Sequence, residues 1–134
     1  MKRIISTPNA PAAVGPYSQA VEVNNTLYIS GQLPINPATA TIEATDIAGQ
    51  TDQVFKNITA ILQAAGYTLD DVVKNRVYLS DISNFAAMNE VYKQYFKSDF
   101  PARAAFAVKD LPLGALVEIE TVAVKWHFIN SLRF

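Results

Sequence analysis

The chain has 134 residues, of which half are hydrophobic and 17% are charged, so one domain with a buried core is expected and intrinsic disorder is not. A formal net charge of −1 offers no basic surface for a phosphate backbone, and a nucleic-acid partner is not expected. Cysteine is absent and histidine occurs once, as His127, which disfavours a thiolate nucleophile, a zinc site and a Ser-His-Asp triad.

The N-terminal residues 1–11 contain a basic pair but only two consecutive apolar residues. This pattern is unlike the apolar region of a signal peptide. No segment approaches the roughly 20 apolar residues that span a membrane. We therefore expect a cytoplasmic protein that does not associate with membranes.

Prolines divide the first part of the chain into short segments. One cluster lies within residues 8–16 and another within residues 34–37, and both are expected in loops or at strand edges because proline lacks an amide donor. Between them, residues 20–23 and 27–30 are predicted strands. The intervening Asn24-Asn25 predicts a tight hairpin, because asparagine tolerates positive φ.

Two amphipathic helices are predicted. The first covers about residues 46–65, with Asp46 or Thr51 as its N-cap and Gly66 as a left-handed C-terminal residue. Its apolar residues at helical spacing are Val54, Ile58, Ile61, Leu62 and Ala65. The second helix opens at Ser83, and its apolar face is formed by Phe85, Met88, Tyr92, Tyr95 and Phe96.

Further strands are predicted over residues 72–79, 102–108 and 116–126, and residues 2–6 form a candidate first strand. Strands and helices thus alternate irregularly along the chain. This order predicts an α+β fold, a two-layer sandwich in which two helices cover one face of a mixed six-stranded sheet.

The predicted last strand has two different faces. Its residues Val117, Ile119 and Ala123 suit a face covered by helices. The opposite face carries two carboxylates, Glu118 and Glu120, and bulky apolar residues, namely Leu116, Val122, Val124 and Trp126. An exposed apolar patch of this kind is expected to pack against other copies of the chain.

On the predicted strand 102–108, alternation separates Arg103 from a more apolar face. We expect Arg103 on the face away from the helices, close to a carboxylate of an adjacent strand. The pair would either line a shared groove or form an ordinary surface salt bridge, which contributes about 0–1 kcal/mol. The pattern alone favours the salt bridge.

Five segments together resemble one protein family. They are GPYSQA at 15–20, ISGQLP at 29–34, NITAILQAAG at 57–66, FPAR at 100–103 and VEIE at 117–120. In this order and spacing, from about Thr7 to Lys125, they resemble the RidA/YjgF family of reactive intermediate deaminases. Each segment alone is weak evidence, whereas five in sequence are strong.

The resemblance implies a chorismate-mutase-like fold and a homotrimer, with a central barrel of sheets, helices outside and clefts between subunits. It also implies hydrolytic deamination of reactive enamines and imines, such as 2-aminoacrylate and 2-iminopropanoate, to 2-keto acids and ammonia. The substrate is then a small molecule that carries a carboxylate. Neither a metal nor an organic cofactor is implied.

Roles for individual residues also follow from the resemblance. Arg103 matches the residue that holds the substrate carboxylate, for which a guanidinium can supply two parallel hydrogen bonds. Glu118 matches the carboxylate that activates water as a general base. Glu120 shares its face and remains an alternative. The other substrate-binding candidates are Tyr17, Ser30, Gly31 and, as a support for Glu118, Asn89.

The chain departs from the family pattern in two places. Ala105 occupies a position where many deaminating relatives have cysteine, and hydrolysis as described needs no thiol. We expect a single domain over residues 1–134, with a core of about 1–125 and an atypical C-terminal tail at 126–134. The tail is expected to dock on a neighbouring surface or to be disordered.

Two other functions remain open at this level. One is a non-catalytic regulatory trimer that binds small carboxylates, which would need Arg103 but not a base at Glu118. The other is an endoribonuclease or translation inhibitor, against which the charge balance argues.

Overall fold

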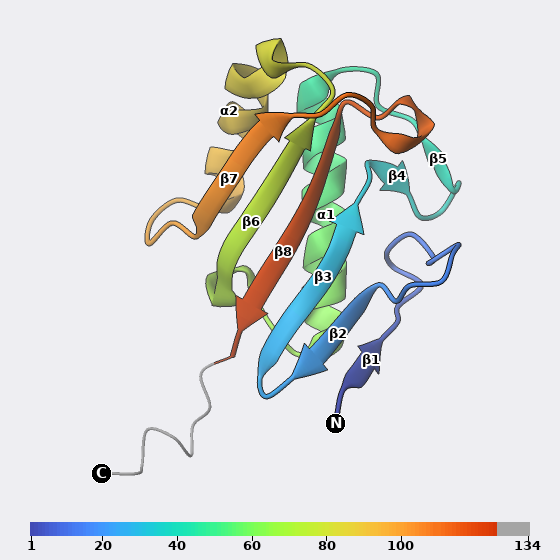
Figure 1. The fold of residues 1–134 in the computed structure, drawn as a ribbon, viewed down its shortest axis with the longest axis vertical. Helices are drawn as coiled ribbons and strands as arrows, with labels where there is room; N and C mark the ends of the chain where they lie inside the picture. Colours follow the sequence, from blue (N-terminus) through green and yellow to red (C-terminus); the bar gives the residue numbers. More distant parts are fainter. Residues whose placement is uncertain (126–134) are drawn as a thin grey trace.

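The computed structural model describes residues 1–125, and both helices lie on one face of a six-stranded sheet (Figure 1). The sheet order is β1-β2-β3-β8-β6-β7. Strands β6 and β7 run parallel, and every other neighbouring pair is antiparallel. The elements are β1 (Arg3–Ile5), β2 (Ala20–Val23), β3 (Thr26–Gln32), α1 (Ile47–Ala65), β6 (Val72–Leu79), α2 (Phe85–Tyr95), β7 (Ala102–Ala107) and β8 (Val117–Val124). The predicted α+β sandwich with a mixed six-stranded sheet is confirmed, including its first strand.

Small elements that were not predicted lie between the main ones. Strands β4 (Ile35–Asn36) and β5 (Thr41–Ile42) form a separate ribbon, and the prolines expected in loops or at strand edges flank β4. Short 3-10 helices cover η1 (Leu69–Asp71), η2 (Ile82–Asn84) and η3 (Pro112–Gly114). The buried Asn57 side chain of α1 donates to the carbonyls of Leu33 (3.1 Å) and Ile35 (2.9 Å), which fastens the ribbon to the helix.

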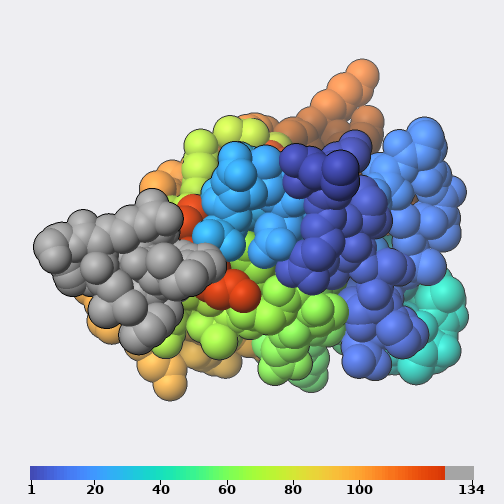
Figure 2. All heavy atoms as spheres, turned by 90° about the horizontal axis from the view of Figure 1, so that it is seen from below, coloured from blue at the N-terminus to red at the C-terminus, as the bar shows by residue number. Residues whose placement is uncertain are grey.

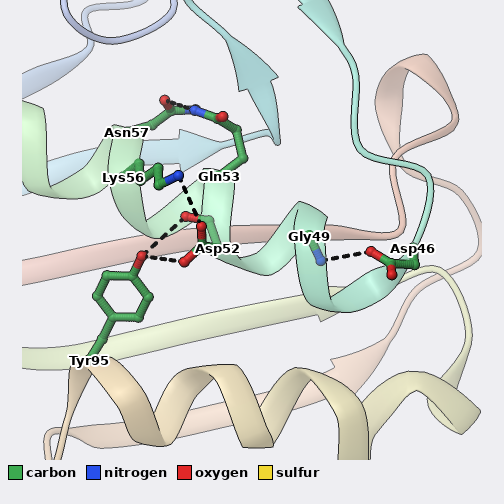
Figure 3. A network of polar contacts seen from close by, with 7 residues as sticks. All are labelled: Asp46, Gly49, Asp52, Gln53, Lys56, Asn57 and Tyr95. Atoms are coloured by element: carbon green, nitrogen blue, oxygen red, sulfur yellow. Dashed lines mark hydrogen bonds and ion pairs between the residues drawn. The ribbon is translucent and has the colours of Figure 1, made fainter.

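Helix α1 has the predicted limits because both of its ends are determined by local contacts. The Asp46 side chain accepts a hydrogen bond from the Gly49 amide at 2.8 Å (Figure 3), which satisfies one of the free amides of the first turn. Gly66 ends the helix in the left-handed conformation, at φ 84°. Thr51, the other candidate cap, is instead buried and donates to the Ile47 carbonyl.

Helix α2 begins two residues later than expected. Ser83 lies in η2, where its amide donates to Asp81, and the α-helix itself starts at Phe85. Between the helices the Tyr95 hydroxyl donates to Asp52 Oδ1 at 2.6 Å, and Lys56 pairs with the same carboxylate at 3.1 Å (Figure 3). The Tyr95 ring also stacks on Phe55, with ring centroids 4.8 Å apart.

A cluster of polar and aromatic side chains stabilises the end of the molecule that is drawn lowest in Figure 1. Arg3 pairs with Glu22 at 2.9 Å and donates to the carbonyl of Ala65 at 3.0 Å. The Tyr67 hydroxyl donates to Glu22, and Lys125 lies 4.9 Å from the Tyr67 ring centroid. Figure 2 shows this end, with β1 beside the β2–β3 hairpin. The cluster therefore ties the edge strand β1 to the end of α1.

The predictions for His127 and for the tail at 126–134 lie outside the described residues. Within residues 1–125, no helix combines the length and the apolar character that crossing a membrane requires.

Candidate active site

Strand β8 presents two carboxylates on the sheet face that the helices leave open. Val117, Ile119 and Ala123 are fully buried under the helices, as predicted. Glu118 and Glu120 alternate with them and are half-buried on the opposite face. Of the apolar residues expected beside them, Val122 is half-buried and Val124 is exposed. Leu116 instead packs against the hydrophobic core, and Trp126 lies outside the described residues. The chemistry of this face depends on which carboxylate is free.

The two carboxylates have different surroundings. Glu120 Oε1 accepts hydrogen bonds from Arg76 Nη1 at 2.8 Å and from the Tyr78 hydroxyl at 2.6 Å. No cation pairs with Glu118 in residues 1–125. Burial raises the pKa of Glu118, and the negative charge of Glu120 raises it further. Glu120 is therefore committed to an ion pair, while Glu118 is available to exchange a proton.

Gly31 leaves the space that the Glu118 side chain occupies. The pairing of β3 with β8 shifts register between Ile29 and Gln32, and the bulge brings Gly31 against Glu118. A Cβ atom at Gly31 would collide with a carboxylate oxygen of Glu118 and would lie 3.0 Å from its Cδ. Glycine is thus required here by close approach of a side chain, not by a special φ angle.

Ser30 connects this strand to the segment that contains Tyr17. The Ser30 hydroxyl donates to the Ser18 carbonyl at 2.6 Å, and the Ser30 amide donates to the Gln19 carbonyl at 3.0 Å. Tyr17 precedes this contact and its side chain is 51% exposed. The structure thus brings Ser30 and Gly31 to the part of the sheet where Glu118 lies, and Tyr17 belongs to the segment that Ser30 contacts.

Arg103 and Asn89 form a second cluster, on the other side of the sheet. Arg103 Nη1 donates to Asn89 Oδ1 of α2 at 2.6 Å. The guanidinium carbon lies 4.7 Å from the ring centroid of Tyr92 and 5.4 Å from that of Phe85, which are favourable cation–π distances. The arginine is nevertheless exposed. Its hydrogen bond and the two rings hold the guanidinium in one orientation.

The expectation that Arg103 lies on the open face beside a carboxylate of an adjacent strand is wrong. In the β6–β7 register Arg103 is paired with Asn75, which is buried beneath α2. Arg103 therefore points toward α2, and β6 lies between its strand and β8. Asn89 consequently contacts Arg103 and does not support Glu118. Arg103 and Glu118 do not meet within one subunit.

Several residues around these clusters were missed by the sequence interpretation. Arg76 and Tyr78 were visible only as polar members of an alternating strand. The buried Gln19 side chain accepts from the Thr7 amide at 2.7 Å and donates to the Pro11 carbonyl at 2.8 Å. It thereby connects the N-terminal loop to the segment whose backbone contacts Ser30. Its place in the GPYSQA segment was the only sequence signal for this role. Across residues 1–125, no group of three or more His, Cys, Asp or Glu side chains is arranged for a metal ion.

Comparison with known proteins identifies the family. A family model described as endoribonuclease L-PSP matches residues 7–125. The chain belongs to this family, the RidA/YjgF proteins. The human protein named 2-iminobutanoate/2-iminopropanoate deaminase is 50% identical over 125 residues, which are 93% of this chain and 91% of the human one.

Solved structures of RidA/YjgF proteins superpose closely on this fold. A Rid family protein of Yersinia pestis has a TM-score of 0.91 and 50% identity, over 93% of this chain and all of that chain. The TdcF protein of E. coli, solved with bound serine, has a TM-score of 0.88 and 39% identity, over 92% of this chain and 99% of that one. The predicted family and fold are therefore confirmed.

Proposed function

We propose that this RidA/YjgF protein is a 2-iminobutanoate/2-iminopropanoate deaminase that hydrolyses reactive enamines and imines to 2-keto acids and ammonia. The observation that carries the proposal is the half-buried Glu118 carboxylate, which lies against Gly31 and has no cation partner among residues 1–125. A general base needs a carboxylate that is not neutralised by a cation and whose pKa is raised toward the working pH. The name of the 50% identical human relative supports the same reaction.

The proposed reaction needs no redox step. The enamine is protonated at carbon to give an iminium ion, and water adds to the iminium carbon as it loses a proton. That proton is then passed to the nitrogen of the carbinolamine, which expels ammonia and loses its hydroxyl proton to leave the keto acid. Glu118 is the group that accepts a proton from the attacking water. Ser30 and Tyr17 hydrogen-bond the substrate or the water, and the backbone of Gly31 allows close approach. No metal or organic cofactor takes part in this scheme.

Arg103 is proposed to anchor the substrate carboxylate. Asn89 occupies one N–H group of the guanidinium, and an arginine has five, so the remaining ones can form two parallel bonds to a carboxylate. The rings of Tyr92 and Phe85 restrict the guanidinium before substrate arrives. Asn89 thereby contributes to substrate binding by orienting Arg103.

We further propose that the protein is a homotrimer with its sites between subunits. Glu118 and Arg103 lie on opposite sides of the sheet with β6 between their strands, so one substrate reaches both only if they come from different subunits. The open face also exposes large apolar residues, among them Ile4, Tyr28, Phe106 and Val124. A face of this kind favours burial against further copies of the chain.

The test is a coupled assay in which a dehydratase generates 2-aminoacrylate and pyruvate formation is followed. Wild type should accelerate the reaction, and Arg103→Ala should remove the acceleration. Lys109→Ala is the matched control, because Lys109 is an exposed cation that follows β7, and it should behave as wild type. No acceleration by wild type, or equal acceleration by Arg103→Ala, would overturn the assignment.

A second candidate is a non-catalytic protein that binds small carboxylates. The structure of the TdcF relative with bound serine favours it, since serine carries a carboxylate. The Glu118→Gln variant separates the two functions. It should retain ligand binding and lose turnover if the protein is the deaminase, whereas a pure binding protein shows no turnover before or after the substitution.

A further inference from the structure

We propose that Arg76 and Tyr78 are positioning residues for Glu118, because they fix Glu120 as a charged neighbour of the working carboxylate. The inference rests on the proposed role of Glu118 as proton acceptor. It assigns a function to Arg76, Tyr78 and Glu120, three polar side chains of the open face, that does not require them to contact the substrate.

The geometry of the cluster is the first argument. Arg76 faces Glu120 directly across the β6–β8 pair, and Tyr78 faces Glu118. From that position the Tyr78 hydroxyl reaches diagonally to Glu120 Oε1, where Arg76 Nη1 also donates. The Tyr78 ring is held in turn by an edge-to-face contact with Phe106 of β7, at a centroid distance of 5.5 Å. Glu120 is therefore fixed from two directions, whereas Glu118 is not.

The second argument is electrostatic. Residues two apart on one strand share a face and are roughly 6–7 Å apart. At this distance a fixed negative charge opposes ionisation of a half-buried carboxyl group. Glu120 raises the pKa of Glu118 in this way, second only to burial. By the same Coulomb argument, the positive charge of Arg76, which is paired with Glu120, opposes this effect.

The groups that face Glu118 from the other elements are few. Strand β6 contributes Arg76 and Tyr78, and β8 contributes Glu120. Strand β3 brings Ser30 and Gly31, which carry no charge. The charge balance at Glu118 within one subunit therefore depends mainly on the Arg76–Glu120 pair.

The direct test is carbon-13 NMR titration of the glutamate side chains in the intact protein. The chain contains five glutamates, so selective labelling gives five carboxyl signals, and Glu118→Gln identifies the one of interest. Glu120→Gln should lower the titration midpoint of Glu118 by about half a pH unit, because a negative neighbour is lost and Arg76 remains. Arg76→Gln should raise the midpoint by a similar amount.

Three further variants separate positioning from a general structural effect. Arg76→Lys keeps the charge and should return the midpoint to near the wild-type value. Tyr78→Phe keeps the ring and both charges but loosens Glu120, so it should lower the midpoint by less than Glu120→Gln. The double variant Glu120→Gln with Arg76→Gln should lie between the two single variants.

The same variants are then assayed for deamination. Because the base must be ionised, the acid limb of the kcat/KM profile should move with the NMR midpoint, to lower pH in Glu120→Gln and to higher pH in Arg76→Gln. An active wild type whose Glu118 midpoint stays fixed, or moves in one direction in both variants, would overturn the inference and leave the deaminase assignment intact. The predicted midpoint changes in a protein without turnover would instead refute the deaminase assignment.

Discussion

The substitution Gly31→Ala tests whether Glu118 is the working carboxylate with little change to the rest of the molecule. Gly31 does not have a positive φ, so alanine introduces no backbone strain. The added Cβ would overlap a Glu118 carboxylate oxygen and approach Cγ to 3.3 Å. The carboxylate must then move by about 1 Å, and a displacement of this size can lower the rate about 100-fold.

A 100-fold loss in kcat/KM corresponds to about 2.7 kcal/mol of transition-state stabilisation. The thermal stability should change little, because Gly→Ala substitution at a compatible φ restricts the unfolded chain by about 0.4–1 kcal/mol and offsets the local crowding. The assay is steady-state deamination with circular dichroism melting alongside. The combination of large kinetic and small stability effects distinguishes this substitution from a core defect.

The control places Gly31→Ala in the Glu118→Gln background. If alanine acts by displacing the carboxylate, it should hardly change the residual deamination rate of the Glu118→Gln variant, so the two effects on the rate should not add. Kinetics within twofold of wild type for Gly31→Ala would refute the reasoning. An equal loss in both backgrounds would show that Gly31 acts through something other than Glu118.

Three other predictions concern stability. Burial and Glu120 raise the pKa of Glu118 above its ordinary value in the folded state, so the stability that this group contributes is lost as pH rises through the folded pKa. Glu118→Gln should therefore raise the melting temperature at about pH 8 and have little effect at about pH 4, and a decrease at about pH 8 would contradict this. Tyr95→Phe removes the hydrogen bond to Asp52 between the helices and should cost about 1 kcal/mol in urea unfolding with unchanged kinetics. Asn75→Ala leaves the buried Thr121 and Tyr92 hydroxyls without their partner and should cost about 2–3 kcal/mol in the same measurement, whereas a loss below about 0.5 kcal/mol would show that the site relaxes.

The parts of the fold that depend on nearby residues could be predicted from the sequence. Helix α1 was predicted within one residue because Asp46 and Gly66 define its ends by local hydrogen bonds and a left-handed turn. The β2–β3 hairpin followed from Asn24 and Asn25, which both adopt positive φ. The limits of β6 were also predicted correctly.

The face of Arg103 could not be predicted, because alanines occupy both faces of β7. Ala104 and Ala105 fit either side, so alternation carries no information there, and only the parallel register with β6 decides the orientation. The strand pattern alone also left the choice between Glu118 and Glu120 open. It depends on Arg76 and Tyr78, which are over 40 residues away in the chain and become neighbours only through strand pairing.

Buried amide side chains were also beyond the sequence interpretation. Gln19 and Asn57 lie in the interior because each satisfies loop carbonyls that have no partner in the sheet. Hydrophobic periodicity does not detect such residues, since their partners lie in irregular segments. Resemblance to a family singled out the segments that contain them but gave no role for either side chain.

The measurement that most directly tests the account is complementation between two inactive subunits. Arg103→Ala and Glu118→Gln should each reduce deamination to a small residual rate as homo-oligomers, because every site then lacks its anchor or its base. Coexpression of the two with different tags, followed by purification through both, should restore activity, since some interfaces combine an intact Glu118 with the Arg103 of a neighbour. Each mixed trimer selected in this way should contain one intact site among its three interfaces, so about a third of the wild-type activity is expected. Mixed oligomers that remain inactive would contradict a site shared between subunits.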